Sequence, residues 1–287
     1  MGPLAHKSPA VMRMFNVVTL VVGALAVAAA PAAELPIFDA HLHYSHDAWE
    51  SVPPAQAIEI LRKAGIKRAL VSSSNDDGNQ RLLAAAPDLI LPSLRPYRTR
   101  ADVGAWVRED AIVAYLEEHL KKYRYVALGE FHLYGADADL AVPRRMVQLA
   151  QQYNLVLHAH SDVDAIGRLF LQYPAARILW AHSGFERPEN VREMLKKHKN
   201  LWCDLAFRTD HATAGKPSPE WRALFMEFPD RFMLGTDSYV PERWHFIIEH
   251  ARWARAWLAD LPADVAERIA FRNGEALFGP VATPRKP

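Results

Sequence analysis

The sequence predicts a (β/α)8 TIM barrel, and two observations support that prediction. Eight apolar stretches typical of strands alternate with eight stretches of helical periodicity after residue 34. Several of the apolar stretches end in side chains that can bind metals or move protons. Active sites of such barrels lie at the carboxyl ends of the strands. A doubly wound open sheet is the competing fold, but no Gly-x-Gly-x-x-Gly follows the first apolar stretch.

The expected elements follow each other in the order that the barrel requires. The strands are expected at 36–44, 66–74, 89–97, 125–135, 155–161, 176–184, 200–208 and 231–239. The helices are expected at 54–65, 78–86, 103–123, 142–153, 163–172, 188–198, 219–228 and 242–261. Several of these helices begin at a capping residue or an early proline, as at Ser218-Pro219, and several end near Gly, Pro or Asn.

Residues 1–33 have the order of a secretory signal peptide. Lys7 and Arg13 precede an uncharged apolar stretch at 14–30, and small residues follow as far as Ala33. An uncleaved membrane anchor is the alternative, although the stretch is slightly short of the ~20 residues that a span needs. We expect a single barrel domain at 34–287 that is exported to the periplasm or secreted, with membrane attachment only if the signal is uncleaved.

The charge balance favours a small-molecule partner. The chain has 34 Lys and Arg against 33 Asp and Glu, a formal net charge of +1, so no strong field attracts nucleic acid. Cys203 is the single cysteine, which excludes an internal disulfide and indicates a buried, unreactive thiol. Nothing in the composition indicates an oligomeric state.

The end of the first expected strand carries the sequence Asp39-Ala-His41-Leu-His43. Residues i and i+2 of a strand point to the same face, so both histidines can reach one cation. Later expected strands carry Glu130, His158, His182 and Asp237 at or near their ends. Imidazole and carboxylate are the ligands that zinc and similar metals accept, so this distribution predicts a metal-dependent hydrolase site.

Five motifs resemble the amidohydrolase superfamily, specifically its amidohydrolase-related group of metal-dependent barrels. They are Phe38-Asp-Ala-His-Leu-His43, Leu157-His-Ala-His160, Trp180-Ala-His-Ser-Gly184, Leu234-Gly-Thr-Asp-Ser238 and Arg272-Asn-Gly-Glu-Ala-Leu-Phe278, in that order along the chain. The resemblance implies that His41, His43, His158 and Asp237 bind a divalent metal, with zinc expected. It implies that His182 binds a second metal or polarises the substrate.

Two positions leave alternatives open. His158 and His160 share one face of their strand, and we favour His158 as the ligand and His160 as a residue facing the substrate. Glu130 resembles the metal-bridging carboxylate of TatD-type hydrolases, which would give a site for two ions. The alternative is that Glu130 only orients a ligand histidine, which leaves one ion.

The expected reaction is hydrolysis of an ester, lactone or amide by a metal-activated water. Asp237 would be both ligand and general base, and His182 would stabilise the developing charge on the carbonyl oxygen. Arg95 and Arg208 could bind a substrate carboxylate, and Tyr44 and Tyr239 could line the pocket. The alternatives are a metal-dependent nonoxidative decarboxylase of the same group and a noncatalytic extracytoplasmic binding protein.

Overall fold

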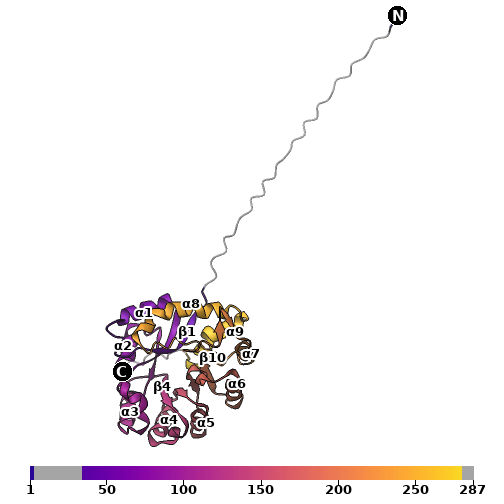
Figure 1. The fold of residues 1–287 in the computed structure, drawn as a ribbon. Coiled ribbons are helices and arrows are strands. Elements are labelled where there is room, and N and C mark those ends of the chain that lie inside the picture. The colour runs from indigo at the N-terminus through magenta and orange to yellow at the C-terminus, as the bar shows by residue number, and fades with distance from the viewer. Residues whose placement is uncertain (3–33, 280–287) are drawn as a thin grey trace. The chain divides into compact units, whose positions relative to one another are not determined.

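The structure, a computed structural model, describes residues 1–2 and 34–279, and the second range forms a parallel barrel ringed by helices (Figure 1). The barrel strands are neighbours in chain order: β1 (Ile37–His43), β2 (Ile66–Ser72), β3 (Ile90–Leu94), β4 (Ala127–Leu133), β5 (Val156–Ser161), β6 (Ile178–Trp180), β7 (Leu201–Asp204) and β10 (Phe232–Met233). A bridge between Asp39 and Leu234 brings the last strand back to β1. The predicted (β/α)8 TIM barrel is confirmed.

Helices connect consecutive strands and lie outside the ring. They are α1 (Pro54–Lys63), α2 (Asp77–Ala85), α3 (Ala111–Lys122), α4 (Ala141–Tyr153), α5 (Val163–Gln172), α6 (Pro188–Lys197), α7 (Pro219–Glu227) and α8 (Ile247–Leu258). A short antiparallel pair, β8 (Ala212–Thr213) and β9 (Lys216–Pro217), lies between β7 and α7 and is not part of the barrel.

Several expected boundaries differ from the structure. In place of a helix at 103–123, the 3₁₀ turns Arg100–Gly104 and Trp106–Arg108 precede α3, because the Asp102 carboxylate accepts the amides of Arg98 and Thr99 and tightens the chain. The helix expected at 242–261 begins as a 3₁₀ turn, Pro241–Phe246. The strands expected at 176–184 and 231–239 are much shorter, since irregular turns follow β6 and β10.

The amino-terminal end of the barrel is closed by the last helix. Seven strands contribute to one apolar cluster that fills the barrel interior, with Phe38, Leu70 and Val156 among its members. Helix α10 (Asn273–Phe278) adds Leu277 to this cluster, and the Phe278 ring stacks on Phe38 at 5.7 Å. The carboxyl ends of the strands are therefore the end left for a site.

In the described part of the chain, no helix combines the length and apolarity needed to cross a membrane. The apolar stretch at 14–30 lies outside that part, so the signal peptide stays a prediction.

One buried histidine leads to a prediction about acid stability. The His211 ring lies with its edge toward Trp253 and Trp257, is 1% exposed, and has no hydrogen-bond partner for either nitrogen among the described residues. Burial lowers the pKa of His211 to about 3. Between about pH 6.5 and 3 the unfolded chain therefore binds a proton that the folded chain does not, and the free energy of unfolding falls as the pH falls.

We expect wild-type protein to lose about 2 kcal/mol more unfolding free energy between pH 7 and pH 5 than His211→Leu, because one pKa unit corresponds to about 1.4 kcal/mol. Denaturant titrations of both proteins at the two pH values measure the difference. The other histidines are common to both proteins and cancel in the comparison. Parallel pH dependence would contradict the prediction.

Candidate metal centre

Two imidazoles of β1 meet at the centre of the site. The Nε2 atoms of His41 and His43 are 3.1 Å apart, and both side chains are buried. The other nitrogen of each ring contacts a second polar side chain. The Nδ1 atom of His41 lies 3.2 Å from the Asp204 carboxylate, and Nδ1 of His43 lies 2.7 Å from the Ser72 hydroxyl. These contacts aim both Nε2 atoms at the same point.

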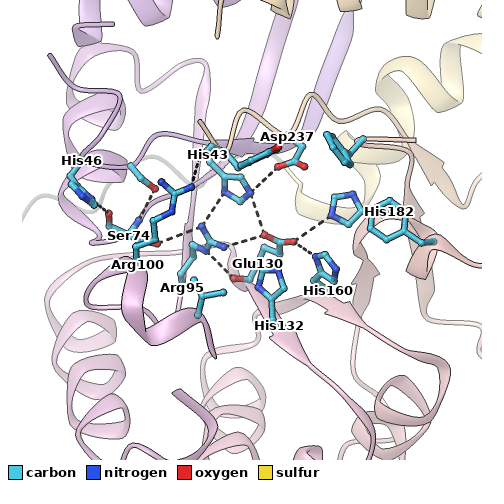
Figure 2. Close-up of a pocket in the computed structure, with 15 residues that line it drawn as sticks. His43, His46, Ser74, Arg95, Arg100, Glu130, His132, His160, His182 and Asp237 are labelled. Carbon is cyan, nitrogen blue, oxygen red and sulfur yellow. Dashed lines mark hydrogen bonds and ion pairs between the residues drawn. The ribbon is translucent and has the colours of Figure 1, made fainter. Parts of the chain in front are cut away.

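The Glu130 carboxylate lies between two sets of histidines (Figure 2). Its Oε2 atom is 3.2 Å from His43 Nε2 and 3.6 Å from His41 Nε2. Its Oε1 atom is 2.8 Å from His160 Nδ1 and 3.5 Å from His182 Nε2. Burial opposes ionisation of this carboxyl, but the neighbouring histidines, with His41 the strongest, hold the pKa of Glu130 well below its usual range.

Asp237 enters the centre from the loop that follows β10. Its backbone lies in the left-handed region at φ 48°, and its amide donates to the His41 carbonyl at 2.7 Å. This conformation places Oδ1 at 3.3 Å from His43 Nε2 and 3.8 Å from His41 Nε2. Burial opposes ionisation, yet His41 and His43 lower the pKa of Asp237 to about 2. Asp237, His41 and His43 thus form one group with metal-binding geometry.

His182 is positioned by an unusual turn directly after β6. His182, Ser183 and Gly184 all have positive φ, so the chain reverses within three residues. A Cβ on Gly184 would lie 2.1 Å from the Trp180 ring, which restricts this position to glycine. His182 Nδ1 donates to the Ala206 carbonyl at 2.8 Å, and this leaves Nε2 directed at Glu130.

Asp204, at the end of β7, is a residue that the sequence analysis missed. Its fully buried carboxylate lies 3.2 Å from His41 Nδ1 and 3.0 Å from His158 Nε2, and it accepts the His182 amide at 2.9 Å. Burial opposes its ionisation, but His41 and His158 hold the pKa of Asp204 far below its usual range. Asp204 is the first charged residue after Leu201-Trp-Cys, which could have indicated the end of the strand. The strand was instead expected to continue to residue 208.

The two histidines of β5 have different environments. His158 faces Asp204 and His41, in a group separate from His43 and Asp237, and burial lowers its pKa to about 4. His160 instead faces Glu130 and lines the cavity, with its ring 4.7 Å from that of His182. The structure therefore places His160, and not His158, beside Glu130 and His182.

We expect Asp204→Asn to weaken metal affinity about 10- to 100-fold, the usual effect of losing a group that orients a ligand histidine. The asparagine amide is neutral, so it cannot supply the negative charge that the carboxylate presents to His41 and His158. Titration with Zn²⁺ against a competing chelator measures the affinity. Asp88→Asn is the control, since this carboxylate pairs with Arg62 on the surface. Equal affinities for both variants would show that Asp204 does not position the ligands.

The donor set fits a cation on chemical grounds. Because a carboxylate and a carbonyl only accept, His41 and His182 must carry their protons on Nδ1, and their Nε2 lone pairs then face other acceptors. Without a cation or an added proton, the His41, Glu130 and Asp237 acceptors would repel each other at 3.6 and 3.8 Å. A divalent ion removes this conflict, and imidazole with carboxylate suits zinc.

A cavity of about 300 Å³ opens over this centre. The residues that line it come from loops at the carboxyl ends of the strands: His43, Ser45, His46, Ser74, Arg95, Arg100, Val103, Glu130, His132, His160, His182, Phe185, Phe207, Asp237 and Tyr239. Of the residues expected to contact substrate, Arg95, His160 and Tyr239 line this cavity. Phe185 lies just past a strand end, as expected for a pocket residue, whereas Arg100 and Phe207 were not anticipated as cavity residues.

Tyr44 and Arg208 do not line the cavity, which corrects their expected contact with substrate. Tyr44 is fully buried, and its hydroxyl donates to the Val52 carbonyl at 2.8 Å. The Arg208 guanidinium donates to the His182 carbonyl at 2.9 Å and pairs with Asp210 at 2.7 Å. Its contacts support the His182 turn from outside the cavity.

Comparisons with known proteins agree with this architecture. Residues 38–279 match the model of a family described as amidohydrolase. A search of curated proteins gives no match. Among solved structures, YjjV, a TatD homologue from Escherichia coli K12, is 19% identical with a TM-score of 0.58, covering 84% of this chain and 97% of its own. A Pseudomonas putida protein assigned as a 2-pyrone-4,6-dicarboxylic acid hydrolase is 17% identical with a TM-score of 0.56, covering 85% and 98%.

An uncharacterised TIM-barrel protein, Bb4693 from Bordetella bronchiseptica, is 16% identical with a TM-score of 0.53, covering 85% of this chain and 98% of its own. Likenesses at these identities show the fold alone. The match to the family model covers most of the described barrel and includes every residue of the metal centre.

Proposed function

Since the chain belongs to the amidohydrolase family, we propose that it is a metal-dependent hydrolase that cleaves an ester, lactone or amide bond of a small carboxylated molecule. The observation that carries this proposal is the position of Glu130. Its two oxygens face two sets of imidazoles at the base of one cavity. This arrangement suits one carboxylate shared by two cations.

We assign the ligands from the directions of their atoms. One ion would be held by His41, His43, Asp237 and the Oε2 atom of Glu130. The other would be held by Oε1 of Glu130 with His160 and His182, in place of the His158 expected from the sequence. A bound divalent ion of this kind, zinc by its ligands, lowers the pKa of a coordinated water from 15.7 toward about 7.

The residues around the centre would perform the proton transfers. Asp237, ionised and fixed beside His43, would accept the proton of the attacking water and later deliver it to the leaving group. In a site with one ion, His182 would donate from Nε2 to the carbonyl oxygen as its charge develops. Burial lowers the pKa of His182, but its contact with Glu130 outweighs this and raises it.

The entrance supports a substrate with a carboxylate. Arg95 and Arg100 line the same cavity, with Arg95 Nη2 at 3.2 Å from Glu130 and Arg100 Nη1 at 2.6 Å from Asp47. A guanidinium can form two parallel hydrogen bonds to a carboxylate. The Pseudomonas putida protein of similar fold is assigned to a dicarboxylic pyrone, which contains a lactone, and this agrees with the proposed substrate class.

The test begins with metal content and then turnover. Protein prepared without chelator should contain about one or two divalent ions per chain by elemental analysis. Metal-loaded protein is then screened against lactones, esters, amides and aromatic carboxylic acids. Hydrolysis that stops on metal removal and returns with Zn²⁺ supports the proposal. A metal-free, fully active sample contradicts it, and release of CO₂ in place of hydrolysis assigns a decarboxylase.

We further propose that the protein acts on its small-molecule substrate outside the cytoplasm and does not bind nucleic acid. The support is the signal-like order of residues 1–33 and the net charge of +1. Amino-terminal sequencing of protein from the periplasm or medium should give a first residue near Glu34. Full-length protein in the cytoplasm would contradict export.

A further inference from the structure

Three exposed aromatic side chains lie at the mouth of the cavity. Phe185, Phe207 and Tyr239 are 50%, 48% and 42% exposed, and all three line the cavity. Only nine large hydrophobic side chains of the described residues are exposed, so a third of them gather at this one place. We call these three residues the aromatic rim. Clustered exposed apolar groups mark binding sites more often than scattered ones do.

The backbone of the rim is strained. Phe185 and Phe207 have φ values of 53° and 54°, in the left-handed region that favours glycine and is costly for a bulky side chain. Neither ring recovers this cost by burial, since both remain about half exposed. Such strain gathers at ligand sites, where it fixes a side chain in place before binding.

The rim is tied to the metal centre. The Phe185 ring stacks on His182 at 4.5 Å with planes 14° apart. Phe207 packs edge to face with Tyr239 at 5.8 Å, and the Arg243 guanidinium lies 4.8 Å from the Phe207 ring centre. Arg243 also donates to the Asp237 carbonyl. A group bound on the rim would therefore lie beside both His182 and the loop of Asp237.

Two arginines also line the cavity. Figure 2 shows Arg95 and Arg100 on one side of Glu130, with His160 and His182 on the other. Arg95 is only 7% exposed, so its guanidinium is held in place and its charge is poorly screened by solvent. The cavity thus combines exposed aromatic rings with two guanidinium groups, and Arg100 Nη2 lies 3.5 Å from the Tyr239 carbonyl oxygen.

We propose that the aromatic rim selects substrates with a planar unsaturated ring, whose carboxylate faces Arg95 and Arg100. The inference rests on the proposed function, which places the reacting bond at the metal centre. A volume of about 300 Å³ lies at the lower end of the range for small-molecule pockets, which suits one ring with its substituents. Offset or edge contacts between aromatic rings favour a flat ring over an aliphatic ring of similar size.

Calorimetric titration of zinc-loaded protein with benzoate, cyclohexanecarboxylate and acetate tests the proposal, since these carry the same charge. We expect benzoate to bind about 3- to 10-fold more tightly than cyclohexanecarboxylate, as for an aromatic pair, and acetate to bind more weakly still. Phe185→Ala and Phe207→Ala should each remove the preference for benzoate. Phe246→Ala is the matched control, because this ring is 61% exposed but does not line the cavity.

Equal affinity for the two cyclic acids overturns the proposal, as does absence of benzoate binding or an equal loss in Phe246→Ala. If the alanine variants do not fold, the wild-type comparison decides alone. Phe207→Gly adds a second measurement. Because glycine adopts the positive φ of this position without strain, the unfolding midpoint should be unchanged or higher. A lower midpoint would mean that the Phe207 ring stabilises the fold, which contradicts its assignment to ligand binding. Benzoate binding does not require turnover. If the hydrolase proposal fails and the rim proposal holds, the protein is inactive toward the screened substrates but still prefers benzoate.

Discussion

Asp237→Asn is expected to lower turnover by at least about 10²-fold even where the metal is retained, because general-base catalysis is typically worth 10²- to 10⁴-fold. The amide can still direct an oxygen at the cation, but it cannot accept the proton of the attacking water. The measurement is kcat on the best substrate from the screen, with metal content determined on the same sample.

The pH profile separates this role from a loss of folding. Burial opposes ionisation of Asp237, but His41 and His43 lower its pKa to about 2, so the carboxylate is charged throughout the working range. An acidic limb of activity then reports a coupled titration with the attacking water. Asp164→Asn is the control, since that carboxylate pairs with Arg168 on the surface. Turnover that survives Asp237→Asn at full metal occupancy would refute the assigned role.

Glu130→Gln is expected to reduce metal content from about two ions toward one, with a large loss of activity. The variant keeps the shape of the side chain but removes the charge that both sets of imidazoles share. Elemental analysis of variant and wild type, purified side by side, measures the change.

Glu59→Gln is the matched control, because this carboxylate is exposed and pairs with Lys63 on the surface. Unchanged stoichiometry in Glu130→Gln would mean that Glu130 orients His160 and His182 without binding metal. Loss of all metal would mean that a single site depends on it. The three results are distinguishable in one experiment.

The fold was predictable because strand and helix periodicity alternate in order along the chain. The positions of His43 and Asp237 followed, because they lie at or beyond a strand end and the carboxyl ends of parallel strands meet. Glu130 lies inside β4 (Ala127–Leu133), before the strand end at which it was expected. The pair His158 and His160 could not be resolved, since residues two apart share a face. Strand register gives them different positions: His158 pairs with Gly129, deeper in the barrel, and His160 pairs with His132, nearer the cavity.

The remaining errors come from strand length. β7 ends at Asp204, four residues before the expected end, so the residue that orients His41 was taken as part of a strand interior. Arg208, expected at the strand end, instead lies in the loop and supports His182. The left-handed conformations of His182 and Asp237 were not predicted, because positive φ is uncommon for any residue other than glycine, although Asp and His adopt it more often than most.

The closure between β10 and β1 has a consequence for how activity is lost on heating. β10 has only two residues, and one bridge joins the following Leu234 to β1. The loop residues after β10 make the other hydrogen bonds to β1: the Asp39 carboxylate accepts from Thr236, and the His41 carbonyl accepts the Asp237 amide. A junction that depends on loop residues in place of a long paired strand opens at a lower free energy than the rest of a barrel. Asp237 follows directly, so thermal inactivation would be a local event, with catalysis lost while far-ultraviolet circular dichroism is still native.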